Sequence, residues 1–331
     1  MSMQAIVPIA IPFVTILFLL LIGAGLRQRG MVTTAGARQI TGLVLNVSLP
    51  ALIWVTLASE ITPRELGRAP LLVAMGVIGP MLGYVLSGAV ARWPLFRAGQ
   101  RATFQTAVAV TNTAFVGYPL CEALLGGTGL LYAVLYDVGL TAVMSTFSIW
   151  LLSRASRREL VGAEKPVRLG SAWTELLRSP MMWALILGAA WGAFGWPTPD
   201  WLLRPLRTLG QCTTPLALLT VGMLIQPATA VANLPIDARP ARAWPPLLTL
   251  ALLRLLVIPA LIAGLVVLLR VERTAAAVIV LQTAVPSAVC TTAMVEQYGG
   301  DSSLAAAGVV TTTLLSLLTL PLWSAVMLGR S

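Results

Sequence analysis

The chain has 331 residues, of which 57% are hydrophobic and only 10% are charged, and its formal net charge is +10. This composition excludes a water-soluble globular domain and predicts a membrane protein. The basic residues lie between apolar segments, as in the cytoplasmic loops of membrane proteins, so no nucleic-acid partner is expected. The absence of histidine and of a CxxC pair among three cysteines indicates neither a metal site nor a cofactor.

Ten apolar segments are long enough to cross the hydrocarbon core of a bilayer as helices. In chain order, predicted helices 1 to 10 are residues 5–26, 39–58, 70–91, 103–125, 129–152, 179–195, 207–227, 244–269, 274–296 and 303–328. The predicted fold class is therefore an all-α membrane protein with ten transmembrane helices. The first segment lacks the flanks of a signal peptide and is expected to be a retained helix.

The distribution of Lys and Arg predicts the orientation in the membrane. With the N-terminus outside, the loops assigned to the cytoplasm hold about twice as many basic residues as the outer loops. We therefore expect a multi-pass protein of a bacterial inner membrane, with both termini outside and the loop 154–178 in the cytoplasm. Four arginines in predicted outer loops oppose this orientation: Arg204, Arg207, Arg270 and Arg273.

Similar motifs recur at matching positions in the two halves of the chain. Predicted helices 2 and 7 both place polar residues before a proline, in 46–50 and 211–215, and predicted helices 4 and 9 both contain Gln-Thr-Ala-Val, in 105–108 and 282–285. Helix n thus pairs with helix n+5, and because five is odd the paired helices run in opposite directions. This pattern predicts two inverted five-helix repeats, 1–153 and 179–331. Chance similarity between apolar helices is the alternative.

Prolines interrupt predicted helices 4 and 9 inside the membrane. A proline removes a backbone hydrogen bond, and the freed carbonyl groups need partners from protein or water. Two broken helices that cross near the midplane would direct unpaired N–H groups and positive dipole ends toward an anion. The candidate substrate-binding residues here are Asn112, Thr113, Gly117, Tyr118, Pro119, Pro286, Ser287, Cys290 and Thr291. The alternative is that these prolines only kink the helices for packing.

Predicted helices 2 and 7 add four polar candidates beside their prolines. These are Asn46, Ser48, Thr213 and Thr214. Such side chains either face a transport cavity or form hydrogen bonds between helices, and the sequence favours neither.

Two ionisable residues lie well inside predicted helices, where they are energetically costly. Asp137 is a candidate proton or cation acceptor, and Arg254 is a candidate counter-charge for an anion. The alternatives are a structural ion pair or, for Arg254, a side chain that extends to the membrane surface. Asp301, followed by two serines, is expected to cap the N-terminus of predicted helix 10.

Five motifs occur in the order found in one transporter family. They are Asn46 to Pro50, Asn112 to Leu120, Thr214 to Ala217, Pro286 to Asp301, and Leu314 to Pro321. With these motifs the chain resembles the auxin efflux carrier family, within the bile acid, arsenite and riboflavin transporter superfamily. The motifs span nearly the whole chain.

The resemblance implies a scaffold of helices 1, 2, 6 and 7, a mobile transport domain of helices 3–5 and 8–10, and a homodimer formed through the scaffold. It also implies that helices 4 and 9 cross beside the substrate, with Asn112 and Pro119 matching the helix 4 motif and Pro286 the helix 9 motif. Family substrates include malonate and the carboxylate auxin. Bacterial relatives often have Asn where this chain has Cys290.

The expected function is therefore elevator-like secondary transport of a small organic anion, without enzymatic activity. A P-loop is absent, which argues against ATP-driven transport. An intramembrane aspartyl protease using Asp137 and Asp301 is a weak alternative, because Tyr298 replaces the first glycine of its GxGD motif. A membrane sensor or channel stays open, and coupling to H⁺, Na⁺ or the membrane potential is equally compatible with the sequence.

Overall fold

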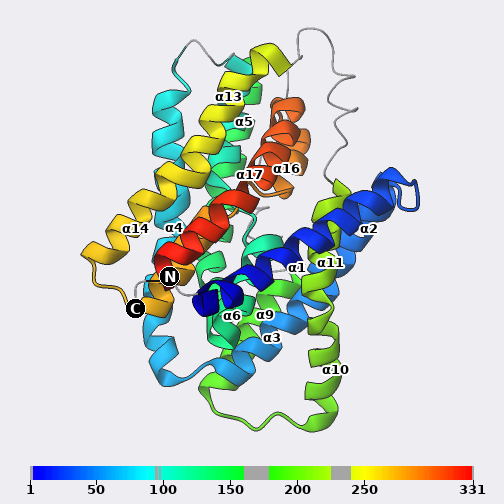
Figure 1. Ribbon diagram of the computed structural model, residues 1–331, viewed down its shortest axis with the longest axis vertical. Coiled ribbons are helices and arrows are strands. Elements are labelled where there is room, and N and C mark those ends of the chain that lie inside the picture. The colour runs from blue at the N-terminus through cyan, green and yellow to red at the C-terminus, as the bar shows by residue number, and fades with distance from the viewer. Residues whose placement is uncertain (1–2, 94–95, 97, 160–178, 225–239, 330–331) are drawn as a thin grey trace. The chain divides into compact units, whose positions relative to one another are not determined.

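The computed structural model describes residues 3–93, 96, 98–159, 179–224 and 240–329, which form helices and no β-strand (Figure 1). The helices are α1 (Met3–Gln28), α2 (Thr34–Leu43), α3 (Leu49–Glu60), α4 (Pro63–Val90), α5 (Ala98–Ala109), α6 (Tyr118–Val143), α7 (Ile149–Glu159), α9 (Pro180–Ala193), α10 (Asp200–Gln211), α11 (Thr213–Leu224), α13 (Pro240–Leu252), α14 (Ile258–Leu268), α15 (Arg273–Ala284), α16 (Cys290–Tyr298) and α17 (Ser302–Leu328). Within these ranges, the π-helical turns are η1 (Val44–Ser48), η2 (Thr113–Gly117), η3 (Met144–Ser148) and η5 (Leu253–Val257). The all-helical class is confirmed.

Six helical segments of the described chain are long and apolar enough to cross a membrane. They are Ile11–Gln28, Thr34–Glu60, Pro63–Val90, Thr113–Ser156, Pro245–Leu268 and Ser302–Leu328, and two shorter apolar helices are Pro180–Ala193 and Arg273–Ala284. The longest segment bends at Gly126, whose φ of 67° and ψ of −157° are not helical. This bend lies between predicted helices 4 and 5. The chain is a multi-pass membrane protein, and the ten-helix inverted repeat stays a prediction.

The described residues fall into two compact units. Unit 1 comprises those within Met1–Leu72, Ala114–Leu135 and Trp173–Ile225, and unit 2 comprises those within Val73–Thr113, Tyr136–Ala172 and Gln226–Ser331. In unit 1, α1 packs along α11, and α3 packs against α9 and α10. In unit 2, α17 packs against α5, α13, α15 and α16, and α14 packs against α15 (Figure 1).

Glycines bring paired helices into close contact inside each unit. In unit 1, a Cβ atom on Gly23 of α1 would lie 2.1 Å from the carbonyl oxygen of Leu219 in α11. In unit 2, a Cβ atom on Gly76 of α4 would lie 1.9 Å from the carbonyl oxygen of Tyr136 in α6. A larger residue at either position would separate the two backbones. These glycines therefore supply the close packing by which helices associate in lipid.

Three of the described π-helical turns end two residues before a proline. Pro50 follows η1, Pro119 follows η2 and Pro259 follows η5. The proline ring clashes with the carbonyl group four residues earlier, and a locally widened helix accommodates this clash. For Pro259 that carbonyl belongs to Leu255, whose oxygen accepts a 2.8 Å hydrogen bond from Nε1 of Trp323 in α17. A side chain of another helix thus replaces the missing backbone donor.

We expect Trp323→Phe to lower the free energy of unfolding by about 1–2 kcal/mol, because it removes the donor to the Leu255 carbonyl while keeping an aromatic ring. Thermal unfolding of the purified protein in detergent measures this change. Trp201→Phe is the matched control, since Trp201 is 75% exposed. Equal melting temperatures for the two variants would contradict this role of Trp323.

Candidate functional site at two broken helices

The breaks that follow α5 and α15 meet in unit 2. Thr111 and Ser287 form an isolated antiparallel bridge. Its backbone hydrogen bonds run from Asn112 N to Pro286 O at 2.9 Å and from Ala288 N to the Val110 carbonyl oxygen at 3.1 Å. The extended segments thus satisfy one another's backbone groups, which the hydrocarbon of a membrane cannot do.

Proline accounts for the break after α15. Val285, which ends this helix, has φ −62° and ψ 155°, an extended conformation of the kind that a following proline imposes. Pro286 has no N–H group to continue the helix. Its carbonyl oxygen is then free to accept the hydrogen bond from Asn112 N. The local sequence therefore ends the helix. It also leaves an extended segment that forms backbone hydrogen bonds with the break after α5.

Arg254 connects the C-terminal ends of α5 and α15. Its side chain is 1% exposed and comes from η5. Nε donates to Val285 O at 3.0 Å, Nη1 donates to Val108 O at 3.1 Å, and Nη2 donates to Thr283 O. Helix C-termini carry partial negative charge, so a planar cation with diverging donors stabilises both ends at once. These backbone contacts correspond neither to an ion pair nor to a side chain that extends to the membrane surface.

Ser287 is held from two sides. Its Oγ donates to the carbonyl oxygen of Ala107 at 2.6 Å, and its backbone N donates to Oγ1 of Thr312 in α17 at 3.1 Å. This candidate residue therefore fixes the position of the break. Its hydroxyl proton is already donated to the Ala107 carbonyl oxygen. Thr312 has no distinctive motif around it, so reasoning from the sequence did not select it.

Asp137 lies beside the same break. Oγ1 of Thr113 donates to Oδ1 of Asp137 in α6, and both side chains are buried. Because Thr113 directly follows Asn112, the carboxylate is coupled to the segment that pairs with Pro286. Cys290 begins α16 on the other side of the break, with its Sγ 3.7 Å from Sδ of Met144.

Several buried polar atoms of these segments have no hydrogen-bond partner in the described part of the chain. They are Oγ1 of Thr111, Nδ2 of Asn112, Oγ1 of Thr291 and both amide atoms of Gln282. A buried polar group left unpaired costs about 1–3 kcal/mol, so these groups require a partner such as water or a polar ligand. The repeated Gln-Thr-Ala-Val motif was the sequence signal for Gln282.

Two backbone N–H groups in the first turn of α16 already have partners within the protein. The backbone N of Thr291 donates to Ala288 O at 3.0 Å, and that of Thr292 donates to Val289 O at 3.2 Å. The expectation that unpaired N–H groups of this half-helix bind an anion is therefore wrong for these two residues, because the preceding turn satisfies them.

The remaining candidates lie in unit 1. Gly117, Tyr118 and Pro119, where η2 leads into α6, are all buried. Asn46 and Ser48 form hydrogen bonds within their own helix, from Nδ2 to Gly42 O at 2.8 Å and from Oγ to Val44 O at 3.4 Å.

The two polar motifs of predicted helices 2 and 7 are neighbours, because η1 packs against both α10 and α11. Oγ1 of Thr214 donates to Oε2 of Glu122 at 3.4 Å. Oγ1 of Thr213 is buried, and it too has no partner among the described residues. Unit 1 therefore holds further polar groups near these motifs, of which Thr214 is hydrogen-bonded to Glu122.

Comparisons with known proteins agree over most of the chain. A family profile described as membrane transport protein matches residues 8–324. The chain is 28% identical over 326 residues to an uncharacterized transporter of Methanothermobacter thermautotrophicus, which covers 95% of this chain and 96% of that protein. It is 22% identical over 224 residues to an uncharacterized transporter of Methanocaldococcus jannaschii, which covers 64% of this chain and 67% of that protein.

Proposed function

The chain belongs to the membrane transport protein family, and we propose that it is a secondary carrier of a small organic anion such as malonate or an auxin-like carboxylate. The family match confirms the resemblance to the auxin efflux carriers that the motifs indicated. The family and the names of the relatives indicate a transporter and not an enzyme. We further propose that it lies in a bacterial inner membrane with both termini outside, the orientation that the basic residues predict.

The observation that carries this proposal is Nδ2 of Asn112, which has no hydrogen-bond partner among the described residues. It is an N–H donor in a side chain only 3% exposed, and within the same described residues the hydroxyl of Thr291 also has no partner. Donors of this kind suit the oxygen atoms of a carboxylate. The buried cation of Arg254 adds a positive charge behind the two breaks, which favours an anion over a cation.

The two units support an elevator-like mechanism. The helices of the expected scaffold, α1 to α3 and α9 to α11, fall in unit 1, whereas α5 and α13 to α17 fall in unit 2. Residues 114–135, expected in the transport domain, group with unit 1. We propose that unit 2 moves relative to a scaffold formed by unit 1 and that the scaffold mediates a homodimer.

Contacts inside each unit also favour an inverted repeat. The breaks in predicted helices 4 and 9 pair in unit 2, and the polar motifs of predicted helices 2 and 7 pack together in unit 1. In each case the two partners are the segments that the repeat makes equivalent. A two-fold relation between the repeats accounts for this, because equivalent segments then meet around the axis.

Counterflow in proteoliposomes tests the proposed transport. Vesicles loaded with unlabelled malonate or an aromatic carboxylate should take up the labelled solute saturably and faster than empty vesicles. Imposed pH, sodium and voltage gradients identify the driving force. Non-saturable flux would favour a channel, and the absence of flux of any carboxylate, with folded protein, would contradict the organic-anion assignment and favour a sensor or another solute.

We expect Asp137→Asn to preserve carboxylate exchange but to lose accumulation driven by a pH or sodium gradient. The amide keeps an oxygen that can accept the hydrogen bond from Thr113, but it can neither titrate nor neutralise a cation. Accumulation should fall to the level of vesicles without a gradient. Thr113→Val is the matched control, since it removes the donor and leaves the carboxylate. Unchanged gradient dependence in Asp137→Asn would exclude Asp137 as the coupling residue.

A further inference from the structure

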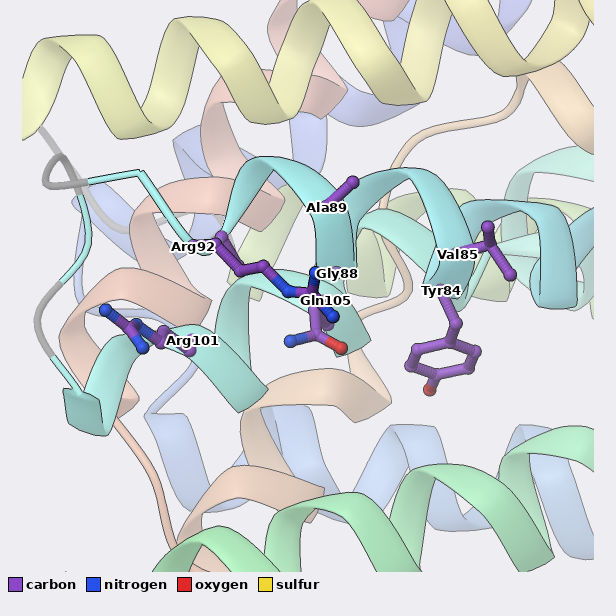
Figure 2. Close-up of a pocket in the computed structure, with 8 residues that line it drawn as sticks. Tyr84, Val85, Gly88, Ala89, Arg92, Arg101 and Gln105 are labelled. Atoms are coloured by element: carbon purple, nitrogen blue, oxygen red, sulfur yellow. The ribbon is translucent and has the colours of Figure 1, made fainter.

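A pocket of about 590 Å³ opens on unit 2 between the C-terminal end of α4 and the N-terminal half of α5 (Figure 2). Its lining residues are Tyr84, Val85, Gly88, Ala89, Ala91, Arg92, Arg101 and Gln105. None of these residues belongs to the two helix breaks. The proposed substrate site therefore does not account for this pocket. The ligand inferred for it does not depend on which solute the protein transports.

Cationic and amide side chains line one part of this pocket. In Figure 2, the Arg92 side chain, which comes from the turn after α4, extends toward Gln105 of α5, and Arg101 comes from the same helix as Gln105. Both arginines are exposed, and neither has a hydrogen-bond or acidic partner within the described ranges. Guanidinium groups bind phosphate oxygens through paired N–H donors. The pocket thus presents the chemistry of a phosphate-binding site.

An apolar stripe continues from the pocket along α4. Val85 is 66% exposed and Ile78 is 40% exposed. Ile78 and Val85 are spaced by seven residues, or about two helical turns, so they lie on one face of α4, and Arg92 follows in the turn after the helix ends at Val90. Val85 and Ile78 are separated by about 10 Å along the helix axis, which is about a third of a hydrocarbon core of about 30 Å. Trp93, 57% exposed, lies at the polar end of α4, where interfacial tryptophans are found.

We propose that this pocket binds the phosphate headgroup of an anionic phospholipid from the predicted cytoplasmic leaflet, whose acyl chain lies along Val85 and Ile78. A free phosphate ion would use the arginines in the same way but would gain nothing from the apolar stripe. The stripe is therefore what assigns the site to a lipid. Gly88 lines the pocket, and a Cβ atom there would lie in ordinary van der Waals contact with Oε1 of Gln105, at 3.5 Å.

Native mass spectrometry of the full-length, delipidated protein in detergent tests this assignment. The probes are phosphatidylglycerol, phosphatidylcholine and inorganic phosphate. We expect the wild type to retain phosphatidylglycerol in preference to phosphatidylcholine. The double variant Arg92→Gln/Arg101→Gln should bind phosphatidylglycerol roughly tenfold to thirtyfold more weakly. Gly88→Leu should weaken binding with no change of charge, because its side chain fills the pocket.

The matched control is Arg29→Gln/Arg154→Gln, which removes the same charge from exposed arginines of the predicted cytoplasmic side outside the pocket. It should bind phosphatidylglycerol like the wild type. Equal affinity in the wild type and in the Arg92→Gln/Arg101→Gln variant would overturn the proposal. Inorganic phosphate that displaces phosphatidylglycerol at an equal concentration would also overturn it, in favour of a soluble anion.

Discussion

Replacing Arg254 with methionine is expected to lower the free energy of unfolding by about 3–5 kcal/mol, since several buried acceptors lose their donor together. The carbonyl oxygens of Val285, Val108 and Thr283 would be left without these hydrogen bonds. The negative ends of α5 and α15 would also lose the cation between them. Because these helix ends position Asn112 and Pro286, carboxylate flux should be lost as well.

Melting temperatures of purified Arg254→Met, Arg254→Lys and wild-type protein measure this effect. Lysine keeps the charge but presents one nitrogen where arginine presents three, so we expect it to restore only part of the stability. Arg204→Met is the matched control, because the Arg204 side chain is 80% exposed and its pairing with Asp200 contributes little. If Arg254→Met melted like the wild type and lost only its affinity for the anion, Arg254 would be a substrate counter-charge instead.

The sequence was sufficient to predict features that depend on neighbouring residues or on a property summed over many residues. The membrane class follows from hydropathy, which adds up over about 20 residues per span. The capping role of Asp301 is confirmed, because its side chain accepts a 2.9 Å hydrogen bond from Leu304 N, three residues ahead. The break near Pro286 was predictable for the same reason, since a proline acts on its own turn of helix.

The partners of Arg254 were not predictable, because they lie 29, 31 and 146 residues away in the chain. Hydropathy marks the residue as buried in a span but says nothing of where its donors point. Because hydropathy is averaged over a whole span, it also does not show where a helix is broken. In predicted helix 4, residues 103–125, the interruption was attributed to Pro119, whereas α5 ends at Ala109 and helical structure resumes at Thr113. The donor that Trp323 supplies to Leu255 depends in the same way on a contact with another helix.

Asn112→Ala is expected to reduce carboxylate flux, as kcat/KM, by roughly 10- to 100-fold, because a hydrogen bond to a charged group contributes about 1.5–3 kcal/mol. The melting temperature should stay at the wild-type value or rise slightly. The side-chain Nδ2 has no partner within the described chain, so its removal breaks no hydrogen bond of that atom. The backbone hydrogen bond from Asn112 N to Pro286 O does not involve the side chain and is retained.

A lower flux with an unchanged or higher melting temperature separates a binding residue from a structural one, since residues selected for binding are often neutral or costly for stability. Asn46→Ala provides the comparison, because its Nδ2 already donates to Gly42 O within its own helix; it should lose stability slightly. Flux assays in proteoliposomes and thermal unfolding in detergent give both readouts. If Asn112→Ala lowered both the carboxylate flux and the melting temperature, Asn112 would be a structural residue. Unchanged flux would place the substrate away from the two broken helices.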